Sequence, residues 1–244
     1  MSWQTLSLHF KQTYEGGYRY LDRCGEFMIA AHERLNCVPG EAKPSGGKME
    51  IPERGVNITF GVADLGVSQE LLTEDASYFV NLCRDLAALG NEIFQPKSIL
   101  RNGFAWKSYW PFPNANDLLS ASLKAGQDSQ NELAKSVGMV SNHKKLDYFF
   151  SSGSKELHVV VQPVTFERVT IPKQNANYRA NRVEKSRVDR FNQFAGKVSA
   201  SLSHALALEV DLMENDPPAK ASFEAQFDEL RKHNEVLRKQ FTVQ

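Results

Sequence analysis

Two carboxylates on one face of a predicted strand are the side chains of this sequence best placed to do chemistry. Glu209 and Asp211 alternate with apolar residues over positions 206–213, and residues two apart on a strand point to the same side of a sheet. Paired carboxylates can hold a divalent cation against a phosphate. One functional alternative is therefore a metal-dependent phosphodiesterase or nuclease. A solvated strand face is the simpler interpretation, because positions 207–230 hold seven acidic residues and one lysine, a net charge of −7 + 1 = −6.

A second group with chemical potential is basic. Between Lys173 and Lys197, seven positive residues oppose two acidic ones, a net charge of 7 − 2 = +5. Cationic side chains grip phosphates and aromatic ones stack on bases, so a nucleic-acid-binding module is the second alternative. Its contact residues would be Arg179, Arg182, Lys185, Arg187 and Arg190, with Tyr178 for stacking. Interleaved acidic residues favour a solvated or internally paired face, and nucleic acid is the less favoured partner.

Other runs depart from the motifs that they approach. Residues 43–48 (KPSGGK) lack both the glycine spacing of a phosphate-binding loop and the Ser or Thr after its lysine. The run from His32 has Asn36 where a zinc helix needs its second histidine. Cys24 has no base that the sequence places beside it, and a nucleophilic thiol needs one. We therefore predict no metal site and no cofactor.

Composition places the chain among ordinary globular proteins. It has 244 residues, 41% of them hydrophobic and 24% charged, and its 29 basic residues balance 29 acidic ones. No global field favours polyanions or membranes, and no apolar run is long enough to span a bilayer. The three cysteines are odd in number and lack metal-ligand spacing, which fits free thiols in a reducing compartment. A cytoplasmic protein without membrane contact is the expectation.

The elements that must position these residues follow from hydrophobic periodicity. Residues 98–112 (SILRNGFAWKSYWPF) read as an aromatic strand with Phe104 and Trp106 on one face and Lys107 on the other. Helical patterns flank this strand, so it should lie in the middle of a sheet. Further strands are predicted at 5–11, 56–62, 146–150, 157–171 and 206–213, and helices at 18–36, 75–93, 116–125, from 188 and from 222. The glycines and prolines of 38–51 predict a mobile surface loop.

This order predicts an α+β fold, with a mixed sheet of about six strands, helices packed on it and a long C-terminal helix. The first half repeats strand then helix, so an internal duplication is one interpretation. The expected organisation is an α+β half at 1–126 built on the aromatic strand, a flexible connection at 127–145, and a second half at 146–244. The second half holds the hairpin, the basic segment, the acidic strand and the terminal helix, and one continuous domain is the alternative.

The terminal helix carries the preferred function. An apolar stripe at near-heptad spacing contains Phe227, Leu230, Leu237 and Phe241, and such a stripe must leave water. It packs either on the chain's own sheet or on another chain, and the two interpretations are equally weighted. With no motif that fixes a chemistry, the sequence favours a non-enzymatic interaction or assembly module. Its partner would be another protein or a second copy of itself.

Three short runs carry a resemblance. The segment GYRYLDRCGE at 17–26, LRNGF at 100–104 and LEVDL at 208–212 resemble parts of sporadically distributed bacterial conserved-hypothetical proteins. The resemblance covers a small part of the chain and transfers no catalytic residue. Their patchy distribution implies an accessory role, for instance in a bacterial defence or mobile-element system.

Overall fold

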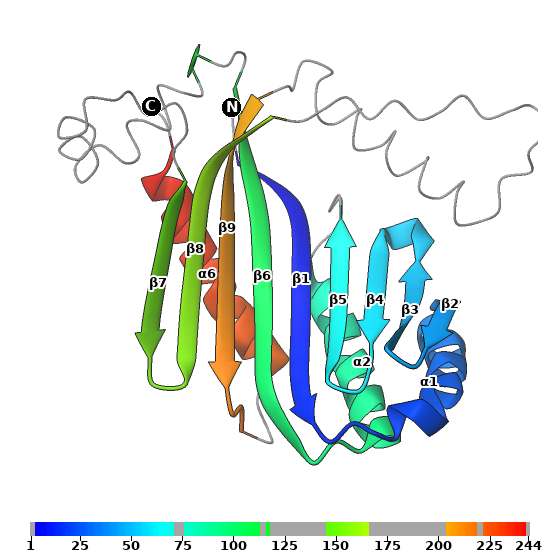
Figure 1. Cartoon of the computed structure of the whole chain (residues 1–244). Coiled ribbons are helices and arrows are strands. Elements are labelled where there is room, and N and C mark those ends of the chain that lie inside the picture. Colours follow the sequence, from blue (N-terminus) through cyan, green and yellow to red (C-terminus); the bar gives the residue numbers. More distant parts are fainter. Residues whose placement is uncertain are drawn as a thin grey trace, which may run out of the picture.

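The structure is a computed structural model that describes residues 3–70, 76–112, 116–117, 145–165, 204–218 and 222–242. Its centre is one nine-stranded sheet in the order β2-β3-β4-β5-β1-β6-β9-β8-β7 (Figure 1). The α+β class and the C-terminal helix are confirmed. Two details of the prediction are wrong: the sheet has nine strands instead of about six, and every described strand pair is antiparallel, so the sheet is not mixed.

The strands are β1 (Gln4–Glu15), β2 (Val38–Lys43), β3 (Gly46–Ile51), β4 (Val56–Phe60), β5 (Asp64–Glu70), β6 (Ser98–Phe112), β7 (Leu146–Ser152), β8 (Lys155–Thr165) and β9 (His204–Asn215). The helices are α1 (Tyr20–Leu35), α2 (Ala76–Phe94) and α6 (Phe223–Gln240), with a 3-10 turn at Pro52–Arg54. The aromatic strand has its expected bounds and lies between β1 and β9.

The segment predicted as a mobile loop is instead the hairpin of β2 and β3. Its glycines and prolines look like breakers, but they sit where a strand tolerates them. Pro39 lies on an edge strand, which can lack one N–H donor. Position 47 of β3 is a glycine because a β-carbon there would come within 2.4 Å of the Phe60 ring. With β5, these two strands account for the difference between six and nine.

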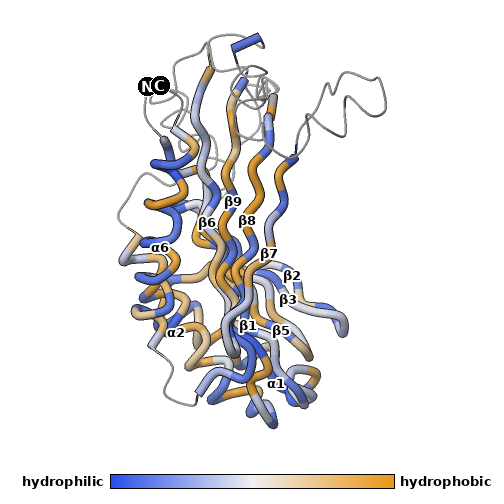
Figure 2. The backbone as a smooth tube through the Cα atoms, turned by 90° about the vertical axis from the view of Figure 1, so that its left-hand side faces the viewer, coloured by the Kyte–Doolittle hydropathy of each residue, from blue (hydrophilic) through white to orange (hydrophobic). Residues whose placement is uncertain are grey.

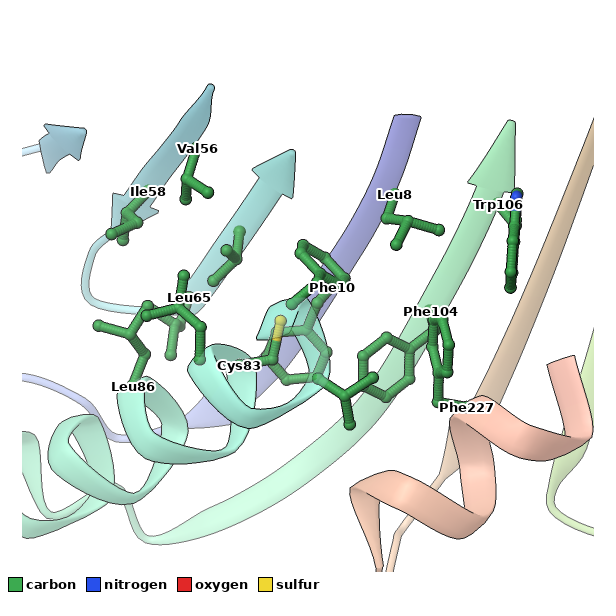
Figure 3. Close-up of a cluster of buried hydrophobic side chains, with 14 of the residues drawn as sticks. Leu8, Phe10, Val56, Ile58, Leu65, Cys83, Leu86, Phe104, Trp106 and Phe227 are labelled. Carbon is green, nitrogen blue, oxygen red and sulfur yellow. The ribbon is translucent and has the colours of Figure 1, made fainter. Parts of the chain in front are cut away.

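Helices α2 and α6 cover one face of the sheet, which Figures 1 and 2 show from two directions. Figure 3 shows the core between these helices and the strands, with Phe10 and Phe104 among its side chains. The ring of Trp106 stacks on that of Phe227 from α6 at 5.4 Å between centroids, and Phe227 also contacts Phe104 edge-on at 5.5 Å. Apolar residues on alternate positions of β1, β6 and β9 therefore face the helices, as period-two alternation requires.

Helix α6 begins and ends with specific polar contacts. At its start, the Ser222 hydroxyl accepts a hydrogen bond from the backbone N–H of Ala225 at 3.2 Å. Near its end, the half-buried Arg238 guanidinium donates to Ser108 at 2.6 Å and to Thr5 at 3.1 Å, beside the Trp106 ring. Burial lowers the pKa of Arg238 to about 10. These bonds fix the helix against both β6 and β1.

Several predictions concern residues that lie wholly or mostly outside the described ranges. The predicted helix at 116–125 is described only at residues 116–117, and the connection at 127–145 only at Lys145. The basic segment lies outside the described residues altogether. Among the described helices, none combines the length and the apolar composition that crossing a membrane requires.

Candidate functional site

The face of the sheet opposite α2 and α6, here called the open face, carries the predicted acidic pair. Strand register places Lys107 beside Glu209 and Ala105 beside Asp211. On the far side of β9, His158 lies beside Asp211, and Phe149 lies beside His158. One row across four strands therefore joins the acidic strand to β7.

Glu209 is engaged in an ion pair. Its carboxylate lies 2.9 Å from the Lys107 ammonium on the neighbouring strand. On β1, the Ser7 hydroxyl lies 2.8 Å from His9 Nε2, and burial, followed by the nearby Lys107 charge, lowers the pKa of His9. The Lys107 charge thus acts on Glu209 of β9 and on His9 of β1, the two strands beside β6.

Asp211 differs from its neighbour because it lacks a close cation. Burial, and then the charge of Glu209, raises the pKa of Asp211 from 3.8 to about 6. Its Oδ2 lies 3.7 Å from Nδ1 of His158, whereas its buried Oδ1 has no hydrogen-bond partner within the described structure. A carboxyl with this pKa can exchange protons near neutral pH.

His158 links Asp211 to β7. Its Nε2 lies 2.6 Å from Oδ1 of Asp147, and the other oxygen of Asp147 lies 2.6 Å from the Lys145 ammonium. Hydrogen bonds from Lys145 and then His158 lower the pKa of Asp147. The Phe149 ring stacks on the imidazole at 4.2 Å, with 5° between the planes. Asp147 and Phe149 of β7 therefore both contact one histidine of β8, and Lys145 joins this group through Asp147.

A hollow of about 290 Å³ lies beside Asp211 on the open face. It exists because Gly103 and Ala105 place almost no side chain over the centre of β6. Its cationic walls are already paired: Lys11 lies 2.8 Å from Asp64, and Arg101 lies 3.4 Å from Glu156. The remaining titratable groups of the hollow are His9 and Asp211, and the basic group nearest to Asp211 is the His158 ring at 3.7 Å.

Our reading of the sequence did not single out one surface of the described structure, the side of β7 that faces away from β8. Tyr148, Phe149 and Phe150 are consecutive and are 41%, 77% and 53% exposed. The rings of Tyr148 and Phe150 stack on one face at 6.2 Å, while Phe149 lies on the open face. On one side β7 pairs with β8; on its other side no described strand pairs with it. We call this side, with its three rings, the β7 edge.

The hairpin turn determines which backbone groups the β7 edge presents. The two turn residues are Gly153, at φ +61°, and Ser154, between the paired Ser152 and Lys155. A two-residue turn that starts with glycine at positive φ closes on a hydrogen-bonded pair, and pair types then alternate along the ladder. The N–H and C=O groups of Asp147, Phe149 and Ser151 therefore point away from β8, toward the free side.

The opposite edge of the sheet is protected. Strand β2 has a proline at position 39, an irregular register between Pro39 and Ala42, and an ion pair of 2.8 Å between Lys43 and Glu41. Proline, bulges and charges are the devices by which sheet edges resist pairing with other chains. The β7 edge has none of them from Tyr148 to Ser152.

The residues predicted as an interface lie inside the molecule. Phe227, Leu230 and Phe241 are buried in the core, and Leu237 packs against it. The residues from Arg179 to Arg190 lie outside the described structure. Within the described residues, no three His, Cys, Asp or Glu side chains gather in a way that could hold a metal ion. The thiols of Cys24, Cys37 and Cys83 are free.

Part of this site could have been found in the sequence. The run YFF directly before SSGS joins three aromatic residues to a turn, and it lies in a strand that was predicted. That β7 is the last strand of the sheet depends on long-range pairing, which no local pattern shows. No protein-family model matches this chain, and comparison with curated proteins finds no match either.

Proposed function

We propose that this protein is a non-enzymatic interaction module that binds an extended segment of a partner protein at the β7 edge. The observation that carries the proposal is the contrast between the two ends of the sheet: β2 is charged and interrupted, whereas β7 is uncharged and aromatic from Tyr148 to Ser152. Natural sheets avoid an open apolar edge unless something pairs with it. Addition of a strand to such an edge is a common mode of peptide recognition.

The apolar surface of the β7 edge supports binding energetically. Three consecutive residues carry exposed rings, two on the helix-side face and one on the open face, and full burial of one aromatic side chain contributes roughly 1.5–3 kcal/mol. A partner strand would satisfy the outward backbone groups of three residues at the same time. Contacts of both kinds act together in strand addition: the backbone supplies affinity, and the side chains supply specificity.

The open face prepares this edge for binding. Asp147 is held by Lys145 and His158, and the Phe149 ring rests on His158. A strand held in its bound shape loses little conformational entropy when a partner arrives. The polar row of the open face thus has a mechanical role in this proposal, without any bond being made or broken.

An accessory role in a bacterial defence or mobile-element system is the biological setting that the resemblance at 17–26 suggests. An adaptor without its own chemistry fits that setting.

Selection from a displayed library of eight-residue peptides tests the proposal. Peptides that bind the wild-type protein are counter-selected against Phe149→Lys, which places a charge on the free edge. We expect the surviving sequences to alternate aromatic or β-branched residues with polar ones. Their synthetic forms should bind the wild type at least tenfold more tightly than Phe149→Lys in fluorescence anisotropy.

The matched control is Ala42→Lys, which adds the same charge to the exposed edge strand β2. It should bind the selected peptides as the wild type does. Methylation of alternate peptide nitrogens should abolish binding from one set of positions and spare it from the other, because only one side of the peptide strand pairs with β7. Peptides that bind the wild type and Phe149→Lys equally would contradict the proposal.

A metal-dependent phosphodiesterase or nuclease remains the second candidate, and one observation favours it: Asp211 borders the hollow of about 290 Å³ on the open face. Glu209 would share the metal, although its carboxylate is engaged by Lys107. Titration calorimetry with Mg²⁺ and Mn²⁺, on the wild type and on Glu209→Gln and Asp211→Asn, tests this candidate. Absence of both metal binding and nucleic-acid cleavage in the wild type would remove it.

Nucleic-acid binding through Arg179, Arg182, Lys185, Arg187 and Arg190 is the third candidate. A gel-shift series at rising salt tests it, because binding through phosphates weakens steeply with ionic strength.

A further inference from the structure

We infer that the strand bound at the β7 edge is β7 of a second copy of this chain, in an antiparallel pair centred on Phe149. This inference rests on the proposed strand-addition function and names its partner. It follows from the register, the backbone groups and the charges of one short strand.

Register is restricted by the two faces of the sheet. In an antiparallel pair, residues directly opposite each other point to the same face. Tyr148 and Phe150 share the helix-side face, and Phe149 takes the open face. Only registers that pair even with even numbers and odd with odd keep these faces matched. Among them, the one centred on Phe149 sets Tyr148 opposite Phe150 of the partner subunit, and the two Phe149 rings opposite each other.

The backbone fits the same arrangement. The residues whose N–H and C=O groups point outward are the odd-numbered ones, Asp147, Phe149 and Ser151. In the register centred on Phe149, each of them meets an outward-pointing residue of the second copy. Every outward N–H and C=O group of these three residues can therefore form a hydrogen bond across the pair.

Charge does not oppose the pairing. The one charged residue of β7 is Asp147, and its opposite residue is Ser151 of the partner subunit, whose hydroxyl can donate to a carboxylate. Asp147 is already neutralised by Lys145 and His158. Like charges directly opposite each other would destabilise a strand pair, and this register contains none.

The size of the contact sets its strength. The exposed parts of the three rings amount to roughly 300–400 Å² per copy, taking about 200 Å² for a whole aromatic side chain. Doubled, this is below the roughly 1,200–2,000 Å² of stable complexes. The dimer should therefore be weak and concentration-dependent, as transient interfaces are, with dissociation in the high micromolar range.

Analytical ultracentrifugation of the full chain over a wide concentration range is the first test. We expect the weight-average mass to rise with concentration for the wild type and for Ala42→Lys, and to stay monomeric for Phe149→Lys. Thermal melting of each variant shows whether it is folded, and Phe149→Lys should melt near the wild type because its side chain is 77% exposed.

Cross-linking is the second test, and it addresses the register. In a Cys24→Ser background, a short bis-maleimide should join two copies of Phe149→Cys, whose α-carbons would lie about 5.5 Å apart. Ser151→Cys is the matched control on the same face of the same strand. Its two copies would lie about 14 Å apart along the strands, so they should not be joined.

The outcomes separate this inference from the function on which it rests. A wild type that stays monomeric but still binds selected peptides at the β7 edge overturns the second copy as partner and leaves strand addition standing. A dimer that survives Phe149→Lys, or one that cross-links equally at positions 149 and 151, also overturns it. Failure of both peptide binding and dimerisation overturns the two proposals together.

Discussion

Asp211 holds a proton more tightly in the folded protein than in the unfolded chain. Its pKa rises from 3.8 to about 6, first through burial and then through the charge of Glu209. A raised acid pKa means that the folded state is favoured while the carboxyl is protonated. Its contribution to stability is therefore greatest below pH 4 and is lost as the pH rises through about 6.

Asp211→Asn should consequently stabilise the protein at high pH. A shift of this size corresponds to about 3 kcal/mol at most, so we expect a gain of about 1–3 kcal/mol at pH 8 and almost none at pH 3.5. Urea denaturation at the two pH values measures the difference. Glu209→Gln is the contrasting variant: it removes part of the repulsion on Asp211 but breaks the ion pair with Lys107, so its gain at pH 8 should be smaller than that of Asp211→Asn. If Asp211→Asn were less stable than the wild type at pH 8, burial of the ionised Asp211 carboxylate would not destabilise the folded protein, and this prediction would be wrong.

Trp106 is the second residue with a definite expectation. It is 8% exposed, stacks on Phe227, and donates from its indole nitrogen to the Thr5 hydroxyl at 3.0 Å. Trp106→Ala should cost roughly 3–5 kcal/mol of unfolding free energy, measured by chemical denaturation. The control Trp110→Ala should cost less, since that ring is only partly buried. Equal losses would show that the core does not centre on Trp106.

At the scale of single elements, α1 contains a weak point. Gly25 lies in the interior of the helix on an exposed position, and a β-carbon there would meet no described atom within 4 Å. Gly25→Ala should stabilise the protein by about 0.5–1 kcal/mol, because alanine restricts the unfolded chain and favours the helix. The contrasting variant is Gly47→Ala, which should destabilise because of the Phe60 ring. Paired urea melts decide both.

The elements also show what a sequence can and cannot reveal. Strand β6 was predictable because aromatic residues alternate from Phe104 onward, and α2 and α6 because their apolar positions repeat at helical spacing. Strands β3 and β5 are short and contain Gly47 and Gly66, which locally resemble turn residues.

The candidate site was predictable only in part. Alternation alone puts Glu209 and Asp211 on one face. Their neighbours Lys107 and His158 come from β6 and β8, and strand pairing between distant segments brings them together. The proposed docking edge depends on sheet order, which is a property of the whole fold. Local periodicity carries no information about it.

At the scale of the whole molecule, a substitution in the terminal helix α6 distinguishes packing within the chain from association between chains. Leu237 packs against the core that α6 forms with β6 and β9. Leu237→Glu should lower the unfolding free energy by at least about 2 kcal/mol, because it buries a charge and removes apolar contact. It should leave the association constant of the folded protein unchanged in ultracentrifugation at low temperature. Loss of association with unchanged stability would instead assign the stripe to a partner.

The bonds between β1 and α6 have a consequence for how the chain is made. The Trp3 indole donates to the backbone carbonyl of Arg238, 235 positions later, and the Arg238 guanidinium donates back to Thr5. The N-terminal strand β1 leaves the ribosome early, but it gains these hydrogen bonds only after α6 has emerged. Until β9 emerges, residues 113–203 separate β6 from its second neighbour, and the aromatic face of β6 lacks its cover. This sheet should therefore complete its folding only once α6 has emerged, and a nascent chain stalled before α6 should recruit chaperones and be cut readily by proteases.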